Sequence, residues 1–142
     1  MPEVSETLIV DVPISDVWQL IGGFETMHSW HPAISESEIF ERGGITYRRL
    51  TLTSGDTIVE SMDEHSDEDK SYSYTMTDFG PLPLSAYSAT LSVVLAGNVG
   101  SEIRFAGTFE VISVPNFVVA KAVSKIFRSG LDGIATHFAA SA

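Results

Sequence analysis

The sequence contains no cysteine, few basic residues and no long hydrophobic run. Without cysteine, the chain has no disulfide framework, no thiolate nucleophile and no thiolate metal site. No apolar run approaches the roughly 20 residues that a membrane helix needs. The first ten residues, MPEVSETLIV, lack the positively charged region of a signal peptide. We therefore expect a cytoplasmic protein.

The shortage of basic residues makes the chain strongly acidic. It has 8 Lys and Arg residues against 19 Asp and Glu residues, a formal net charge of −11. A field of this sign repels phosphate backbones and anionic lipid surfaces, so we expect neither nucleic acid nor membrane as a partner. The densest acidic run, residues 60–69, is interpreted as a strand end that leads into a solvated turn.

What remains is the composition of an ordinary globular protein. Hydrophobic residues make up 44% of the 142 positions and charged residues 19%. A chain of this length predicts a single domain over residues 1–142, large enough to bury a sizeable core.

Alternating apolar residues and turn residues predict a sheet-rich chain. Residues 3–12 are expected to form a strand, followed by a short helix over 16–21 with Ser15 as its N-cap. Residues 24–34 predict a second helical turn that Pro32 closes. Short strands separated by turns then favour an antiparallel meander over parallel crossovers. These six strands are expected at 35–41, 45–53, 57–64, 71–78, 84–95 and 102–112.

The C-terminal segment predicts one long helix over residues 115–140 that lies across the sheet. Its apolar residues recur at spacings of three and four, at Phe117, Ala120, Val123, Phe127, Leu131, Ile134 and Phe138. Gly130 and Gly133 interrupt this helix, at a cost of about 1 kcal/mol each relative to alanine. They indicate either a close approach to the sheet or room for a bound molecule.

A charged pair is predicted on the inner face of the sheet. In the hairpin around Ser54-Gly55-Asp56, the parity of the apolar residues brings Arg48 and Glu60 inward. A three-residue loop would place Arg48 opposite Met62 and diagonal to Glu60. Such charges need each other or a water-filled cavity. The pair is therefore either a self-satisfied ion pair or a polar anchor at one end of an apolar pocket.

Several local motifs resemble one known superfamily. They are Val17-Trp18, Trp30-His31-Pro32, Gly43-Gly44, Arg48-Arg49-Leu50, Tyr72-Ser73-Tyr74, Pro81-Leu82-Pro83 and Gly107 with Phe109. With the predicted element order, they resemble the START-like superfamily (SRPBCC, or helix-grip proteins), and its bacterial polyketide cyclase/dehydrase-like branch in particular. The resemblance implies an α+β fold in which a curved seven-stranded antiparallel sheet, two short helices and one long C-terminal helix enclose a cavity. In the family this cavity serves lipid transfer, hormone sensing or polyketide ring closure.

The segment FETMHSWHPAI, residues 24–34, allows three interpretations. His28 and His31 could hold a metal, but two imidazoles are not a site, and we expect no metal. His31 could be a catalytic base partnered by Glu60 or a tyrosine. The third interpretation, which we favour, is that Trp30 and His31 form the lip of the cavity.

The preferred functional hypothesis is binding of a small hydrophobic or amphipathic molecule, with a polar or anionic end at Arg48. The expected ligand-binding residues are Trp30, Arg48, Glu60, Met62, Tyr72, Tyr74, Tyr87, Phe105, Phe109, Phe127 and Leu131. The alternative is a polyketide cyclase or dehydratase that uses the same cavity, with His31 and Glu60 as candidate catalytic residues. No nucleophile elbow, P-loop or dinucleotide fingerprint is present, so no cofactor is expected.

Overall fold

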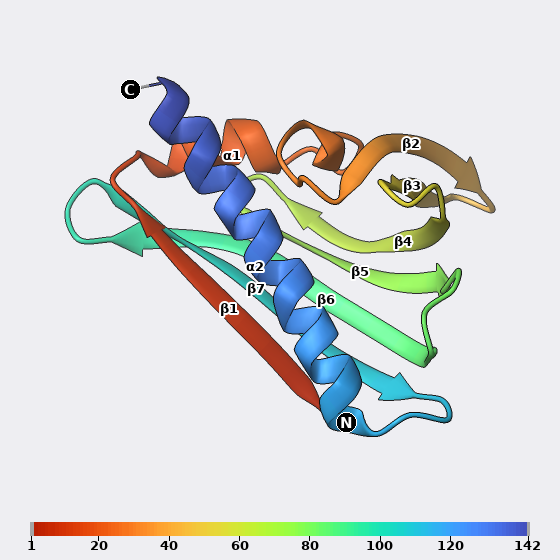
Figure 1. Ribbon diagram of the computed structural model, residues 1–142. Helices are drawn as coiled ribbons and strands as arrows, with labels where there is room; N and C mark the ends of the chain where they lie inside the picture. Colours follow the sequence, from red (N-terminus) through yellow and green to blue (C-terminus); the bar gives the residue numbers. More distant parts are fainter. Residues whose placement is uncertain (1, 142) are drawn as a thin grey trace.

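The chain folds into a curved antiparallel sheet of seven strands crossed by one long helix (Figure 1). The computed structural model describes residues 2–141, with side chains through residue 139. The strands are β1 (Glu3–Val10), β2 (Ile34–Arg42), β3 (Ile45–Leu52), β4 (Thr57–Ser66), β5 (Ser71–Asp78), β6 (Leu84–Ala96) and β7 (Gly100–Val111). The helices are α1 (Ile14–Ile21), the short 3-10 helix η1 (Met27–Ser29) and α2 (Asn116–Ser141). The predicted helix-grip fold is confirmed.

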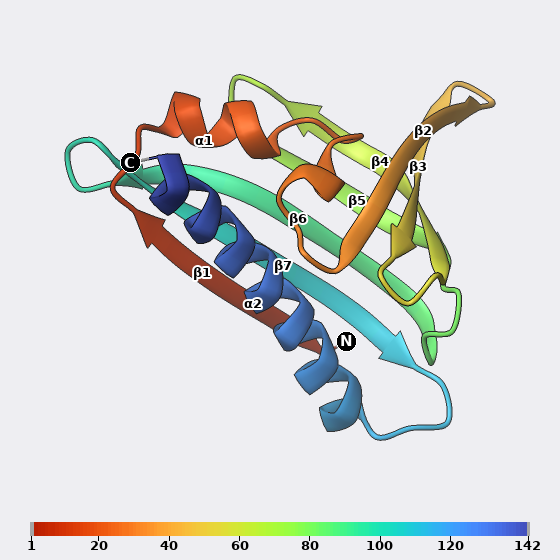
Figure 2. The same ribbon diagram turned by 45° about the horizontal axis from the view of Figure 1, so that its top comes forward.

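The strand order β1-β7-β6-β5-β4-β3-β2 explains how the fold leaves room inside. From β2 to β7 each strand pairs with the next, whereas β1 pairs with β7 at the opposite edge. The helices α1 and η1 connect the two edge strands. Figure 2 shows α2 lying over β1 and β7, away from β2 and β3. The space between α2 and the β2–β4 side of the sheet is where a cavity can form.

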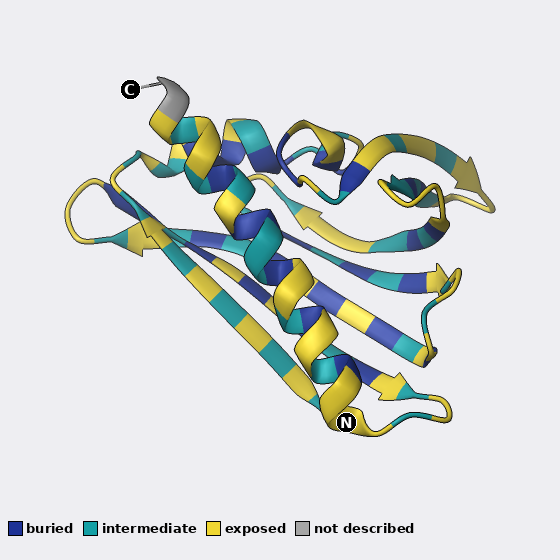
Figure 3. Cartoon of the chain, viewed as in Figure 1, coloured by how far each residue is buried: buried dark blue, intermediate teal, exposed yellow. Residues whose placement is uncertain are grey.

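The core lies between α2 and the concave face of the sheet. Burial alternates along β5, β6 and β7, as period-2 strands with one buried face require (Figure 3). The rings of Phe105 on β7 and Phe127 on α2 stack with centroids 4.6 Å apart. Gly107 permits this close packing, because a Cβ there would lie 3.1 Å from Cζ of Phe127.

The predicted short helix over 16–21 and the predicted long helix over 115–140 both differ from the structure at their N-terminal ends. The helix α1 begins at Ile14 rather than 16, and Ser15 is not its N-cap, because the carbonyl of Pro13 already accepts the N–H groups of Asp16 and Val17. In α2, Phe117 is 74% exposed rather than buried. It precedes Val119, the first buried residue of the helix, by two positions, which is about 200° of helix rotation.

The β3–β4 hairpin is shifted from its predicted register by two residues. The Leu52 N–H donates to the Asp56 carbonyl at 2.8 Å, so the turn is Thr53-Ser54-Gly55 and not the predicted Ser54-Gly55-Asp56. Arg48 therefore pairs directly with Glu60, rather than with Met62. A shift of two preserves the faces of both strands, so the predicted inward orientation still holds.

Candidate functional site

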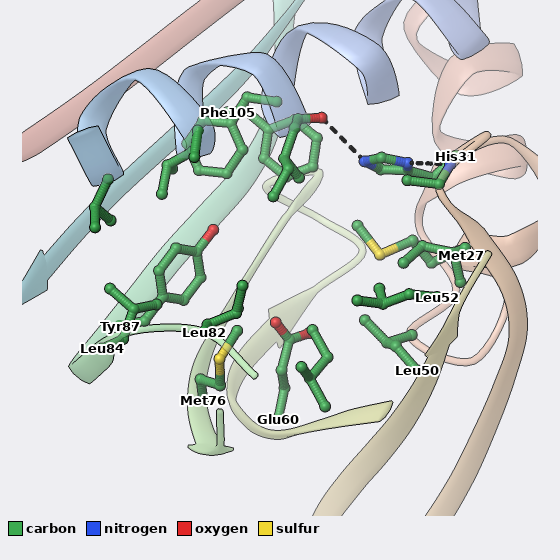
Figure 4. A pocket seen from close by; sticks show the side chains of 18 of the residues that line it. Met27, His31, Leu50, Leu52, Glu60, Met76, Leu82, Leu84, Tyr87 and Phe105 are labelled. Carbon is green, nitrogen blue, oxygen red and sulfur yellow. Dashed lines mark hydrogen bonds between the residues drawn. The ribbon is translucent and has the colours of Figure 1, made fainter. Parts of the chain in front are cut away.

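A cavity of about 490 Å³ lies between α2 and the concave face of the sheet. Its walls come from the segment after α1, from β2 to β7 and from α2 (Figure 4). Most of the lining side chains are apolar, among them Met27, Ile34, Leu50, Leu52, Ile58, Met76, Leu82, Leu84, Phe105, Val119, Val123 and Phe127. The size falls within the range of about 300–1,000 Å³ that is typical of small-molecule pockets.

The cavity opens to solvent at one end of the sheet. Some lining residues are also exposed, and they lie on three neighbouring segments: the β3–β4 turn, the β5–β6 loop and the first half of α2. On α2 these are Val118 (45% exposed), Ala122 and Ile126 (41% exposed). The mouth is therefore formed by Thr53, Ser54, Pro83 and this face of α2. Residues 24–34 are not the lip, since Met27, His31 and Ile34 are buried in the wall and Ala33, their other lining residue, is half-buried.

The polar feature of the interior is the ion pair between Arg48 on β3 and Glu60 on β4. The Arg48 Nε donates to Oε1 of Glu60 at 2.8 Å, and both side chains are almost fully buried. The predicted pairing of these two residues is confirmed. Arg48 Nη1 also donates to the Phe24 carbonyl at 3.0 Å and to the Tyr72 hydroxyl at 3.4 Å.

Arg48 lies behind Glu60 and does not line the cavity. Its guanidinium is packed against aromatic rings, 4.2 Å from the centroid of Phe24 and 4.7 Å from that of Tyr74. Nη2 of Arg48 is buried without a hydrogen-bond partner among the described residues. Arg48 therefore does not meet a ligand in the cavity in the way that the sequence predicts, because Glu60, which accepts its hydrogen bond, lines the wall and Arg48 does not.

Burial controls the protonation of these groups. It raises the pKa of Glu60, against the opposing effect of Arg48. Burial disfavours the charged form of Arg48, but Glu60, Tyr72 and Tyr74 together outweigh it and raise the Arg48 pKa. Burial likewise raises the pKa of Tyr74 and of Tyr87, so both phenols remain protonated at neutral pH.

His31 lines the cavity, but both of its ring nitrogens are engaged. Nε2 donates to the Ile126 carbonyl on α2 at 3.0 Å, and Nδ1 accepts the Ala33 N–H at 3.2 Å. Burial lowers the pKa of His31 to about 4, so the ring is neutral at physiological pH. With one nitrogen protonated and the other already accepting a hydrogen bond, His31 has no free lone pair to act as a base.

The two helical glycines allow α2 to approach residues 30–32. A Cβ at Gly130 would lie 2.7 Å from Cδ2 of His31, and a Cβ at Gly133 would overlap the Trp30 carbonyl oxygen. The glycines therefore permit contact with this segment, and neither the sheet nor a bound molecule takes the space. This contact holds His31 against α2, where its ring lines the cavity.

The structure brings five of the eleven expected ligand-binding residues to the cavity wall: Glu60, Tyr74, Tyr87, Phe105 and Phe127. Four others, Tyr72, Phe109, Leu131 and Trp30, are buried but do not line it. Met62 also lies outside. It is two residues, or about 7 Å, farther along β4 than Glu60 and borders a separate hollow beside Trp18.

Lining residues that the sequence analysis did not propose as ligand-binding include Ile58, Leu84, Val119 and Val123. Ile58 shares the inward parity of Glu60, and Val123 belongs to the predicted helical stripe. Hydrophobic periodicity could thus have indicated both, although it cannot separate a cavity wall from packed core.

Among the described residues, no three His, Asp or Glu side chains come close enough to hold a metal. His28 is exposed, while His31 is buried with both nitrogens bonded. No helix in residues 2–141 has the length and apolar character required to cross a membrane.

Comparisons with known proteins agree on the fold. The model of the family described as "Polyketide cyclase / dehydrase and lipid transport" matches residues 1–139. The protein XoxI from Bacillus cereus is 28% identical with a TM-score of 0.90, over 97% of this chain and 96% of that one. A START superfamily protein from Mycobacterium smegmatis has a TM-score of 0.77 at 18% identity, over 95% of each chain. The Zhui aromatase/cyclase from Streptomyces sp. R1128 has a TM-score of 0.67 at 14% identity, over 95% of this chain and 87% of that one. Among curated proteins, none matches the sequence.

Proposed function

The chain belongs to the polyketide cyclase/dehydrase and lipid transport family, and on this premise we propose that it binds a small hydrophobic or amphipathic molecule. The main support for this proposal is the cavity of about 490 Å³, whose wall is apolar apart from a few polar side chains. Pockets of this kind bind ligands mainly through apolar contact, while a few polar groups fix the orientation.

The energy of such binding comes from apolar area removed from water, at about 25 cal/mol per Å² before the cost of association is subtracted. The ligand would contact Phe127 on α2, with Phe105, Tyr74, Tyr87 and Glu60 on the sheet. Trp30, Tyr72, Phe109 and Leu131 would support these walls from behind.

Titration with the neutral fluorophore N-phenyl-1-naphthylamine tests this proposal. The wild-type protein should bind the fluorophore with a blue-shifted, enhanced emission. Ala122→Trp places an indole at the mouth and should weaken binding at least about tenfold, the effect of losing roughly 1.4 kcal/mol. Lys121→Trp adds the same indole at an adjacent exposed residue that does not line the cavity, and should leave affinity unchanged. Equal affinities of the two variants would contradict binding in the cavity.

A catalytic function in the same cavity is the second candidate, and it would depend on Glu60. The Glu60 carboxylate faces the cavity and has a pKa that burial raises, as a general acid or base requires. His31 is the weaker candidate because its ring nitrogens are occupied. For an enzyme, Glu60→Gln should retain substrate binding and lower turnover of a polyketide-like substrate about 10²- to 10⁴-fold. For a binding protein, wild type and variant should both leave such a substrate unchanged.

A further inference from the structure

The cavity presents a hydrogen-bond acceptor at its polar end. Glu60 is the one charged side chain among the described residues that line it, because His31 is neutral. An ionised carboxylate offers about four acceptor positions and no donor. Among the described residues, only Arg48 donates a hydrogen bond to the Glu60 carboxylate, at Oε1. Figure 4 shows the rest of the carboxylate directed into the cavity.

No donor of Arg48 lines the cavity: Nε donates to Glu60, and Nη2 is buried without a hydrogen-bond partner among the described residues. Nη1 donates to the Phe24 carbonyl and the Tyr72 hydroxyl, and neither Arg48 nor Phe24 nor Tyr72 lines the cavity. A ligand therefore meets the acceptor side of the ion pair and not its donor side. This orientation decides which polar end a ligand can carry.

The charges of the protein narrow the chemical class of the ligand further. A ligand carboxylate would place a second anion against Glu60, in a chain whose net charge is already −11. A ligand ammonium would attract Glu60, but it would add a buried cation within the field of Arg48 that no second anion in the wall offsets. A neutral donor avoids both costs and makes a charge-assisted hydrogen bond to the carboxylate.

We infer that the ligand of this cavity is an apolar molecule with a neutral hydroxyl end, an alcohol or a phenol, that donates to Glu60. This inference rests on the proposed binding function and assigns the chemical class of its ligand. The Tyr87 hydroxyl also points into the cavity (Figure 4), so the ligand would meet both this phenol and the Glu60 carboxylate.

The test compares four naphthalene probes of one shape by titration calorimetry at pH 7: naphthalene, 2-naphthol, 2-naphthoate and 2-naphthylmethylammonium. For the wild-type protein, 2-naphthol should bind about tenfold tighter than naphthalene, as expected for a hydrogen bond to a charged group. The carboxylate and the ammonium should each bind at least about tenfold more weakly than naphthalene. Naphthalene binding as tightly as 2-naphthol, or 2-naphthoate binding tighter than either, would overturn the inference while leaving the binding function in place. Failure of all four probes to bind would instead count against the proposed function.

Two variants test whether the preference for 2-naphthol arises at the Arg48–Glu60 ion pair. The double variant Arg48→Met/Glu60→Leu should retain naphthalene binding and lose the preference for 2-naphthol, because the acceptor is gone. Glu60→Gln leaves the Arg48 charge uncompensated, so 2-naphthoate should gain at least about tenfold relative to naphthalene. Persistence of the 2-naphthol preference in the double variant would contradict the role of Glu60. The wild-type series decides the inference even if one variant does not fold.

Discussion

Replacing Gly133 by alanine should destabilise the protein, although the same change in most exposed helices is stabilising. The helical preference of alanine over glycine contributes about 1 kcal/mol. Here, however, the new Cβ would overlap the Trp30 carbonyl oxygen and lie 2.9 Å from Cδ of Pro32. Because carbon atoms normally pack at about 3.5–4.0 Å, α2 and residues 30–32 must separate by an appreciable fraction of an ångström or more.

That separation also weakens the contact that holds His31 on α2. Overpacking of this kind costs about 1–3 kcal/mol, and a clash with rigid backbone falls at the upper end. After the helical gain is subtracted, we expect a net loss of about 2 kcal/mol, or a Tm lower by roughly 6 °C.

Urea unfolding followed by circular dichroism measures this loss. Thr136→Ala is the matched control, because it changes an exposed residue one turn farther along the same helix. It should raise stability by about 0.5 kcal/mol through helix propensity alone. If Gly133→Ala is as stable as the wild type or more stable, then a glycine is not required at this position for the close approach of α2 to residues 30–32.

Two further predictions concern the buried polar groups. Because the pKa of His31 is about 4 in the folded protein and about 6.5 when unfolded, the unfolded chain binds the proton more readily, so stability falls as pH drops from 6.5 to 4. At about 1.4 kcal/mol per pH unit, the free energy of unfolding measured in urea should fall by about 3 kcal/mol over this range. The His31→Gln variant should lack this fall, and parallel pH profiles of variant and wild type would contradict the prediction. Arg48→Met alone should cost about 3–5 kcal/mol by leaving the Glu60 charge unpaired, whereas Arg48→Met/Glu60→Leu should be nearly as stable as wild type. A double variant as unstable as the single one would show that packing, not charge pairing, dominates there.

Much of the fold could be predicted because the period-2 pattern and the turn residues agree along the sheet. The inward parity of Arg48 and Glu60 follows from their apolar neighbours, and the structure confirms it. The register of their hairpin was less predictable. Gly55 can occupy different positions of a turn, and its φ of +94° belongs to a turn one residue earlier than the sequence suggests.

The candidate site was predictable in part, for a physical reason. Periodicity reports which face of a strand or helix is buried, and so it correctly places Tyr74, Tyr87 and Phe127 inside. It does not report whether the buried face meets another side chain or an empty space. The environment of His31 depends on a contact with Gly130, almost 100 residues away, that no local pattern encodes. Likewise, only the three-dimensional packing shows that Glu60 faces the cavity while Arg48 lies behind it.

The exposed apolar residues offer the main competing location for a hydrophobic probe. Phe117 is 74% exposed, Ile9 66% and Leu95 60%, and all three lie outside the cavity wall. Isolated exposed apolar residues are normal on protein surfaces, but they can bind probes weakly. A binding constant alone therefore does not establish where the ligand lies.

Isotope-filtered NOE spectra of the protein with bound 2-naphthol test the central claim most directly, because they report which side chains touch the ligand. Binding in the cavity predicts NOEs from the naphthalene protons to Ile58, Leu84, Val123 and Phe127, all of which line the wall. NOEs confined to Phe117, Ile9 or Leu95, with none to the four cavity residues, would contradict it.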